Sequence, residues 1–159
     1  ANDRLIPDIL RSFEKNKPVI IRNPKATRPW QHVLEPLSGY LILAQKIYNN
    51  HKEYAEGWNF GPREEDVKPV GWILDKMISK WPDSSWELDQ NSNPHEADFL
   101  KLDISKAESK LGWKPVWELS HTIDKIIDWH KAWLDKEDMQ AVCLAEIEEY
   151  TKDMSNENY

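Results

Sequence analysis

Apolar residues recur at helical spacing over several stretches of the chain, and polar or proline-containing segments separate these stretches. Apolar positions three and four residues apart indicate amphipathic helices, whereas short β-branched or aromatic runs indicate strands. The pattern predicts helices over residues 3–16, 36–48, 67–80, 105–111, 119–133 and 139–150, and short strands over residues 18–21, 30–33, 58–60, 86–88 and 99–102.

Several single residues define the ends and faces of these predicted elements. Asp3 is placed to cap the first helix, and Pro7 falls in its first turn, where proline is tolerated. Gly112 follows the 105–111 helix, as a C-terminal glycine does. In the 36–48 helix, one apolar stripe is expected to pack inward, formed by Leu37, Tyr40, Leu41, Ala44 and Ile47.

The order of these elements favours an α/β fold, because short strands alternate with helices and no internal repeat is visible. Strands this short rarely form a sheet alone. At 159 residues, with 40% apolar residues and nine tryptophans, the chain has the size and composition of one globular domain.

Composition also bounds the classes of function. A net charge of -7 gives little support for nucleic acid binding, and no apolar run approaches the length that spans a bilayer. The single cysteine, Cys143, excludes an intrachain disulfide framework. The absence of a signal-peptide pattern makes a cytoplasmic protein the expectation. Because the chain starts at Ala1 without Met and enters a helical pattern at once, we expect a fragment or a trimmed product.

The segment from Arg28 to Tyr40 reads Arg-Pro-Trp-Gln-His-Val-Leu-Glu-Pro-Leu-Ser-Gly-Tyr and places a guanidinium on a short extended run before an apolar helix. This segment resembles the substrate half of extended short-chain dehydrogenase/reductases that act on nucleotide sugars. Within that family it is most similar to the CDP-glucose 4,6-dehydratases. Other segments agree with this resemblance, namely Asp3–Asp8, Pro18–Pro24, Trp58–Pro62, Pro94–Ala97, Leu100–Ala107 and Leu111–Pro115.

The resemblance runs from about Asp3 to about Trp133 and predicts two parts of the chain. Residues 1–135 are expected to form a nucleotide-sugar-binding portion, including elements that complete the edge of a Rossmann sheet. Residues 136–159 are expected to form an acidic helical C-terminal extension with frayed ends. The predicted fold class is therefore the C-terminal substrate-binding part of an extended short-chain dehydrogenase/reductase, without the N-terminal Rossmann core.

The resemblance also implies a reaction and its partners. Such an enzyme converts CDP-glucose to CDP-4-keto-6-deoxyglucose with tightly bound NAD, for deoxysugar and O-antigen-type pathways, and relatives commonly form homodimers. NAD is expected to be bound mainly by an N-terminal half, because the five glycines of this chain are scattered and form no dinucleotide-binding turn. The chain alone is expected to be inactive. The alternatives are a dehydratase or epimerase of another nucleotide sugar, or a non-catalytic binding or interaction module.

Arg28 is the first candidate for substrate contact, because the planar fork of a guanidinium matches phosphate oxygens. Its alternative role is a surface salt bridge to one of the 28 acidic residues. Arg22 and Asn23 match the position where related enzymes place a residue against the base or ribose. They fit a solvated turn equally well.

Five further residues complete the candidate substrate site. Arg4 and Leu5 resemble the positions where the entry helix meets the nucleotide, with its N-terminal amides available to an anion. Asn59 resembles a strand-end asparagine near the cleft, or it satisfies local backbone groups. His95 and Glu96 replace the family's usual Arg-Pro-Gly-His-Asp run. They are expected either to bind phosphate or ribose or to form a polar loop pair.

Two other kinds of chemistry are excluded by position and spacing. Tyr48 and Lys52 formally spell Tyr-x-x-x-Lys, the catalytic signature of this family, but they follow the Arg28 motif and fall where a helix ends in polar residues. We therefore expect the catalytic residues to lie outside this chain. The five histidines show no ligand spacing with cysteine or carboxylates, so no metal site is predicted.

Overall fold

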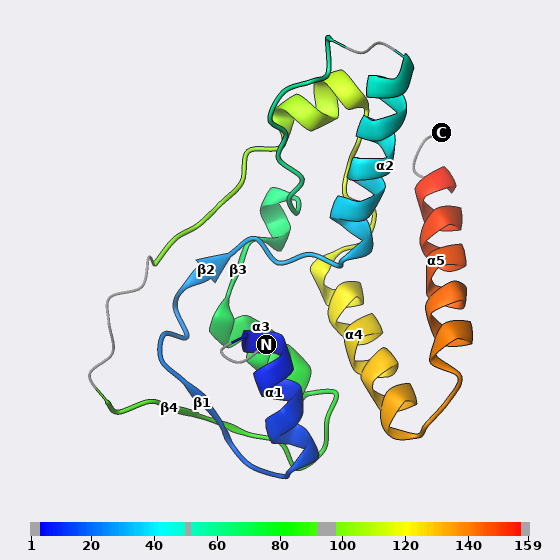
Figure 1. The fold of residues 1–159 in the computed structure, drawn as a ribbon. Helices are drawn as coiled ribbons and strands as arrows, with labels where there is room; N and C mark the ends of the chain where they lie inside the picture. Colours follow the sequence, from blue (N-terminus) through cyan, green and yellow to red (C-terminus); the bar gives the residue numbers. More distant parts are fainter. Residues whose placement is uncertain (1–3, 50–51, 92–97, 157–159) are drawn as a thin grey trace.

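The computed structural model describes residues 4–49, 52–91 and 98–156, and Figure 1 shows their arrangement. In chain order the elements are α1 (Leu5–Glu14), β1 (Val19–Ile21), β2 (Thr27–Arg28), α2 (Leu34–Asn49), the 3₁₀ turn η1 (Glu64–Asp66), β3 (Lys68–Pro69), α3 (Val70–Ile78), β4 (Trp86–Leu88), the π-helical turn η2 (Ala107–Leu111), α4 (Leu119–Leu134) and α5 (Met139–Asn156).

The strands form two small sheets of two strands each within the described residues. β1 pairs in parallel with β4, and β2 pairs antiparallel with β3 so that Arg28 lies opposite Lys68. A single bridge between Thr27 and Phe99 adds one more parallel contact beside β2. Helices and short strands thus alternate, as an α/β fold requires.

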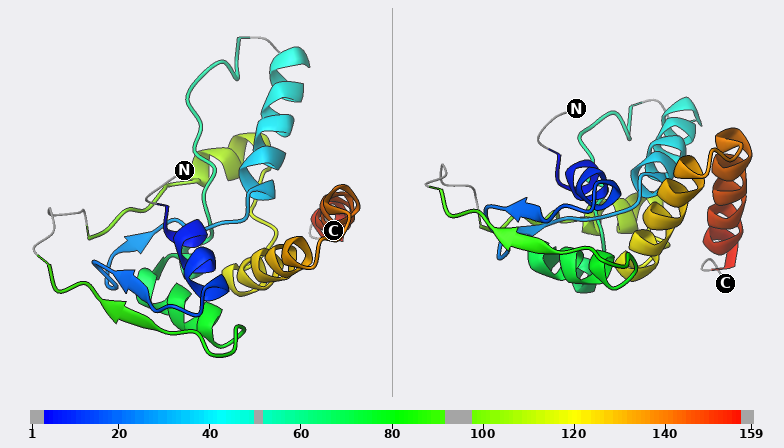
Figure 2. Two further views of the ribbon diagram at one scale, coloured as in Figure 1. Left: turned by 60° about the horizontal axis from the view of Figure 1, so that its bottom comes forward. Right: turned by 90° about the horizontal axis from the view of Figure 1, so that it is seen from below.

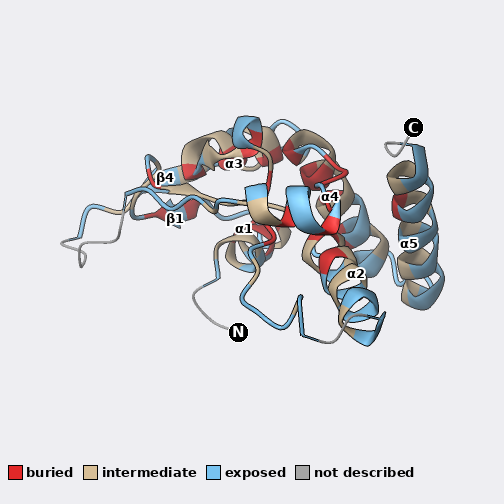
Figure 3. Cartoon of the chain, turned by 90° about the horizontal axis from the view of Figure 1, so that it is seen from above, coloured by how far each residue is buried: buried red, intermediate tan, exposed pale blue. Residues whose placement is uncertain are grey.

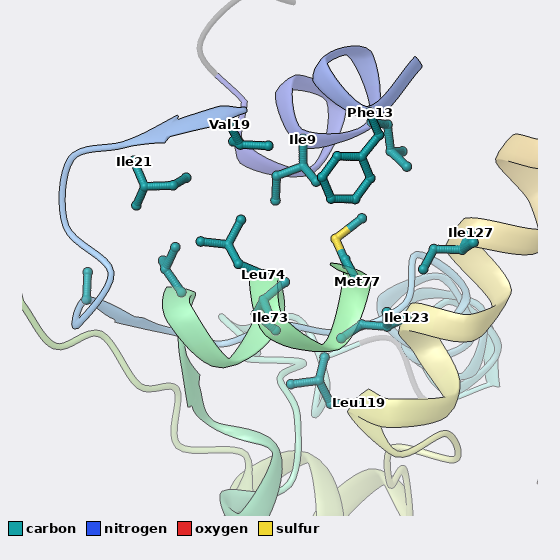
Figure 4. Close-up of a cluster of buried hydrophobic side chains, with 13 residues drawn as sticks. Ile9, Phe13, Val19, Ile21, Ile73, Leu74, Met77, Leu119, Ile123 and Ile127 are labelled. Atoms are coloured by element: carbon teal, nitrogen blue, oxygen red, sulfur yellow. The ribbon is translucent and has the colours of Figure 1, made fainter. Parts of the chain in front are cut away.

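The main hydrophobic core lies between α1, β1, α3 and α4. Figure 4 shows side chains from these four elements pointing toward one another, among them Ile9 and Phe13 from α1 and Met77 from α3. Ile9, Leu74 and Met77 have no exposed surface. Complete burial of such side chains stabilises a fold by roughly 1.5–3 kcal/mol each. This core therefore fixes α1 and β1 relative to the two helices behind them.

A second core forms where α2 meets η2. Phe60, Ala107, Leu111 and Trp113 are buried there, and the Phe60 and Trp113 rings meet edge to face with centroids 5.0 Å apart. Gly39 faces this cluster from α2. A Cβ atom on Gly39 would lie 2.3 Å from a Phe60 ring carbon, so only glycine permits this approach. The segments around residues 39, 60 and 113 are held together in this way.

The predicted inward stripe of α2 is wrong for most of its residues. Leu37, Tyr40 and Leu41 are 45%, 57% and 73% exposed, and Ala44 is exposed as well. Ile47 is half-buried. The face that packs inward instead includes Glu35, Gly39, Ile42 and Leu43. Because apolar residues occur on both sides of this helix, periodicity alone did not distinguish its two faces.

Three of the five predicted strands differ from the structure. Residues 30–33 and 58–60 are irregular, and residues 99–102 contribute only the isolated bridge at Phe99. In the first two segments, side-chain N–H groups rather than backbone N–H groups donate hydrogen bonds to the nearby backbone carbonyls. The Trp30 indole N–H donates to the Lys68 carbonyl at 3.0 Å, and the Gln31 amide donates to the Phe60 carbonyl at 2.9 Å.

The predicted helices are confirmed with shifted ends. Pro7 lies in the first turn of α1, as expected, whereas the proposed cap Asp3 lies outside the described residues. Gly112 ends η2 in the left-handed conformation, with φ of 69°. α5 runs six residues beyond the predicted end at Tyr150. Figure 2 shows α5 at the edge of the molecule beyond α4, and Figure 3 shows that most of its surface is exposed.

The buried carboxylate of Glu35 in α2 connects this helix to two other parts of the chain. One is the segment that precedes α4, and the other is α5. Glu35 is completely buried and accepts hydrogen bonds from the backbone N–H groups of Val116, at 3.0 Å, and Trp117, at 2.8 Å. It also accepts a hydrogen bond of 2.7 Å from the Tyr150 hydroxyl. Burial raises the pKa of Glu35, while the hydrogen bonds from Trp117, Tyr150 and Val116 oppose that rise. These donors satisfy both carboxylate oxygens.

His32 is a second buried polar group beside this connection. Its Nδ1 accepts a hydrogen bond of 3.3 Å from the Leu34 backbone N–H, and its Nε2 lies 3.4 Å from a Glu146 carboxylate oxygen. Burial is the largest cause that lowers the pKa of His32 to about 4, followed by the charges of His121 and Lys125. His32 is therefore neutral at pH 7, and the acceptor role of Nδ1 places its proton on Nε2.

The Glu35→Gln variant is expected to lose about 2 kcal/mol of stability or more. The amide NH₂ that replaces one oxygen then faces a buried donor, which leaves that donor unsatisfied. Urea unfolding monitored by tryptophan fluorescence measures this loss. The Tyr150→Phe variant, which removes only one of the three donors, is expected to lose about 1 kcal/mol. A matched change at the exposed Glu148, Glu148→Gln, serves as the control. Equal stability of Glu35→Gln and this control would contradict the assigned role.

Replacing His32 with asparagine is expected to remove part of the acid sensitivity of the fold. The pKa is 6.5 in the unfolded chain and about 4 in the folded chain, so between these values only the unfolded chain holds the proton. The contribution of His32 is full above pH 6.5 and is lost as the pH falls toward 4. The loss is on the order of 2 to 3 kcal/mol. Urea unfolding of both proteins from pH 7 to pH 4 measures it, and parallel pH profiles would disprove the account.

Candidate functional site

A cavity of about 470 Å³ lies where α1 meets the ends of β1 and β2. Its walls combine apolar side chains with two arginines, one carboxylate and one hydroxyl. The lining residues are Leu5, Asp8, Ser12, Pro18, Val19, Ile20, Ile21, Arg22, Asn23, Ala26, Arg28, Trp30 and Val70. Four of the eight candidate residues, Leu5, Arg22, Asn23 and Arg28, are therefore brought together.

Arg28 reaches this cavity from the end of β2. Its backbone is held by the pairing with Lys68, and its guanidinium donates a hydrogen bond of 2.9 Å to the Thr27 carbonyl. Trp30 lines the cavity beside it and is fixed through its indole N–H on Lys68. A half-buried guanidinium on a fixed backbone offers an anion a preorganised donor.

Arg22 and Asn23 follow β1 and have different roles. Arg22 is exposed and lines the cavity. The Asn23 side-chain oxygen accepts hydrogen bonds from the N–H groups of Lys25 and Ala26, both at 3.1 Å, and its NH₂ donates to Asp98 at 2.9 Å. Asn23 therefore shapes the turn between β1 and β2, which sets the positions of both arginines.

The two residues at the start of α1 do not contribute equally. Leu5 lines the cavity, while Arg4 is exposed and is not among the lining residues. The backbone N–H of Arg4 instead donates a hydrogen bond of 3.0 Å to the Asp8 carboxylate. The first turn of α1 is thus closed by its own side chain.

Asn59 and the rejected Tyr48 do not line this cavity. The Asn59 NH₂ donates a hydrogen bond of 3.2 Å to the Asp103 carbonyl, so this asparagine satisfies backbone in an irregular segment. Tyr48 is 81% exposed on the last turn of α2. His95 and Glu96 lie outside the described residues.

A larger hollow of about 840 Å³ lies elsewhere, between residues 62–65 and 101–108. Two of its cationic groups already have partners, since Lys101 contacts Glu64 and the Arg63 guanidinium donates to the Pro115 carbonyl at 2.8 Å. None of the predicted site residues that the structure describes lines it. We therefore place the candidate site in the smaller cavity, where two arginines meet apolar walls.

Three groups with metal-ligand chemistry meet between α4 and α5. Ligand atoms of His121, Glu149 and Asp153 lie within 4.8 Å of one another. Lys125 is paired with Glu149, and the Trp117 indole N–H donates to Asp153 at 2.9 Å. Their wide separation in sequence explains why spacing did not show the cluster. The existing partners of both carboxylates account for it as an ion-pair network.

Among the lining residues that sequence reasoning did not select, Asp8 and Ile20 lie where they bear on a ligand. Asp8 belongs to the quoted segment Asp3–Asp8 but reads as an ordinary acidic residue in a first helical turn. Ile20 belongs to a predicted strand and is 56% exposed, which places its side chain on the outer face of β1. Only the three-dimensional arrangement places both beside the arginines.

No family model matches the chain. The chain is 58% identical, over 151 residues, to a CDP-glucose 4,6-dehydratase of Salmonella typhimurium. It resembles part of this dehydratase. The aligned region covers 94% of the chain and 42% of the dehydratase, so the chain spans less than half the length of that relative. The resemblance predicted from the Arg28 segment is confirmed. Because so little of the chain is left unaligned, the similarity continues past Trp133, where the resemblance was expected to end.

Solved structures show which fold this is. A UDP-glucuronic acid 4-epimerase from Bacillus cereus, in complex with UDP-glucuronic acid and NAD, matches with a TM-score of 0.65 and 21% identity, over 82% of this chain and 40% of that chain. A UDP-N-acetylglucosamine 4-epimerase from Bacillus cereus matches with a TM-score of 0.57 and 16% identity, over 82% and 44%. The predicted α/β fold class is confirmed. None of the helices in the described ranges is long and apolar enough to cross a bilayer.

Proposed function

We propose that this chain is the nucleotide-sugar-binding portion of a CDP-glucose 4,6-dehydratase. The observation that carries the proposal is the cavity between α1, β1 and β2, in which Arg22 and Arg28 meet apolar walls. Guanidinium groups suit a diphosphate, and an apolar wall suits a pyrimidine ring. The 58% identity to a CDP-glucose 4,6-dehydratase supports CDP-glucose as the substrate.

In this proposal Arg28 binds the diphosphate, while Arg22 contacts the base or ribose. Leu5 and Ile20 supply apolar surface beside the ring, and Asn23 holds the turn that carries the arginines. The resemblance alone supports Arg4, Asn59, His95 and Glu96 as further contacts, of which Arg4 and Asn59 do not line the cavity.

The proposed reaction converts CDP-glucose to CDP-4-keto-6-deoxyglucose and uses NAD for the hydride chemistry. The residues of this chain do not fit a dinucleotide cradle. Gly39 packs against Phe60, Gly112 ends η2, and Gly71 donates its backbone N–H to the Pro24 carbonyl at 2.8 Å. NAD is therefore assigned mainly to the rest of the enzyme, and so are the groups that perform the chemistry. Substrate binding is the task of this chain, which is inactive alone.

The proposal extends to organisation and location. Residues 1–135 form the nucleotide-sugar-binding portion, and residues 136–159 form an acidic helical extension. The full-length enzyme is a cytoplasmic homodimer of a deoxysugar pathway of the O-antigen type.

A second candidate function is a 4-epimerase or dehydratase of another nucleotide sugar. The specific observation in its favour is the shared fold with two UDP-sugar 4-epimerases. The nucleotide that competes for the cavity distinguishes the two candidates. A chain that binds no nucleoside diphosphate would fit the third reading, a non-catalytic interaction module.

Replacing Arg28 with alanine is expected to weaken CDP binding about tenfold or more, because a hydrogen bond to a charged group contributes about 1.5–3 kcal/mol. The Arg28→Lys variant keeps the charge but loses the planar fork, and its affinity should lie between the two. Isothermal titration calorimetry with CDP at constant salt measures these affinities.

The matched control is Lys152→Ala, which removes one positive charge from the exposed face of α5. Its CDP affinity should equal that of the unchanged chain. If the CDP affinity of Arg28→Ala equals that of this control, the assignment of Arg28 is refuted. Circular dichroism verifies that each variant is folded.

A further inference from the structure

The candidate cavity contains one carboxylate among its described lining residues, Asp8, and the charged groups beside it are arginines. Asp8 lies in the first turn of α1 and its side chain is 43% exposed. A carboxylate at the wall of a site for a negatively charged ligand weakens phosphate binding. The same carboxylate can accept hydrogen bonds from a part of the ligand that donates them.

The Asp8 carboxylate is held in a fixed orientation. One oxygen accepts a hydrogen bond of 3.0 Å from the Arg4 backbone N–H, and the other contacts the Arg11 guanidinium. An ionised carboxylate is a pure acceptor with about four lone-pair sites, so each oxygen retains capacity for another donor. Asp8 thus offers a preorganised acceptor at the cavity wall.

The pyrimidine nucleotides that suit this cavity differ in a group that such an acceptor distinguishes. Cytosine carries an amino group at C4, which donates hydrogen bonds, whereas uracil carries a carbonyl oxygen at C4, which only accepts them. A carboxylate binds the amino group and repels the carbonyl oxygen. The C2 carbonyl is shared by both bases, whereas N3 is an acceptor in cytosine and carries an N–H in uracil, so the distinction holds where the carboxylate faces the C4 group.

The other polar groups of the cavity do not make this distinction. Arg22 and Arg28 are donors only, and the proposed function assigns them to phosphate oxygens and to the ribose or the shared C2 carbonyl. The Asn23 oxygen already accepts from Lys25 and Ala26. The Ser12 hydroxyl both donates and accepts, so it accommodates either base.

We propose that Asp8 selects cytidine over uridine nucleotides by accepting a hydrogen bond from the cytosine amino group. This inference rests on the proposed function, since it assigns the base end of the same site. It makes the α1 face of the cavity the base subsite and leaves the arginines for the diphosphate and ribose. Asp8 is then a specificity residue that takes no part in the chemistry.

Titration of the complete 159-residue chain with CDP and with UDP, followed by ¹⁵N–¹H correlation spectra, tests this assignment. We expect a CDP affinity about tenfold or more above the UDP affinity, as one charge-assisted hydrogen bond and its repulsive counterpart provide. In Asp8→Asn the amide can turn its NH₂ toward the uracil carbonyl. The CDP-to-UDP affinity ratio should then fall to about one.

The affinity ratio separates a specific effect from a structural one, because damage to the cavity lowers both affinities together and leaves the ratio unchanged. Glu148→Gln is the control, since it removes one negative charge at an exposed position on α5 and should keep the full ratio. An unchanged ratio in Asp8→Asn, or equal affinities in the original chain, would overturn the role of Asp8 while leaving the proposed function in place. A chain that binds neither nucleotide would refute both.

Discussion

The buried carboxylate of Glu35 is the constraint on which the arrangement of the chain depends. Its two oxygens accept hydrogen bonds from the backbone N–H groups of Val116 and Trp117 and from the Tyr150 hydroxyl. These partners are more than 80 residues away in sequence, so one side chain joins the start of α2 to the segment before α4 and to α5. A buried charge without such donors would be strongly unfavourable, which makes the three contacts interdependent.

The same constraint reaches the candidate site through the backbone before α2. The segment from Arg28 to Val33 runs directly into the first turn of α2, and Trp30 and Gln31 anchor it to the Lys68 and Phe60 carbonyls. On the other side of the cavity, α1 and β1 are fixed by the main core. The two walls of the cavity are therefore positioned by separate clusters of contacts.

The local sequence was sufficient to locate the helices and the candidate arginines. It was insufficient where contacts between distant segments determine which face of an element is buried. The apolar spacing located α1, α3 and α4, because each of these helices buries an apolar face. It assigned the wrong face of α2, since the buried face contains Glu35 and Gly39, whose partners lie far along the chain. A sequence cannot show that a carboxylate is satisfied by distant amides.

The candidate site likewise contains residues that the sequence indicated and residues that only the structure revealed. Arg28 and Arg22 were identified because their segments resemble those of a known family, and the structure brings them to one cavity. Asp8 was overlooked because an acid in a first helical turn is normally explained by the helix dipole. Asn59 was placed at a strand end that does not form, since its segment is irregular and its amide serves the Asp103 carbonyl.

The central claim is that a nucleoside diphosphate binds between α1, β1 and β2. Mapping of CDP-induced shifts in the assigned ¹⁵N–¹H spectrum of the chain tests it most directly. The account predicts that the largest shifts fall on the backbone amides of residues 5–12, 19–23 and 26–30. Shifts confined to residues 62–65 and 101–108, around the larger hollow, would contradict it, and so would the absence of any shift.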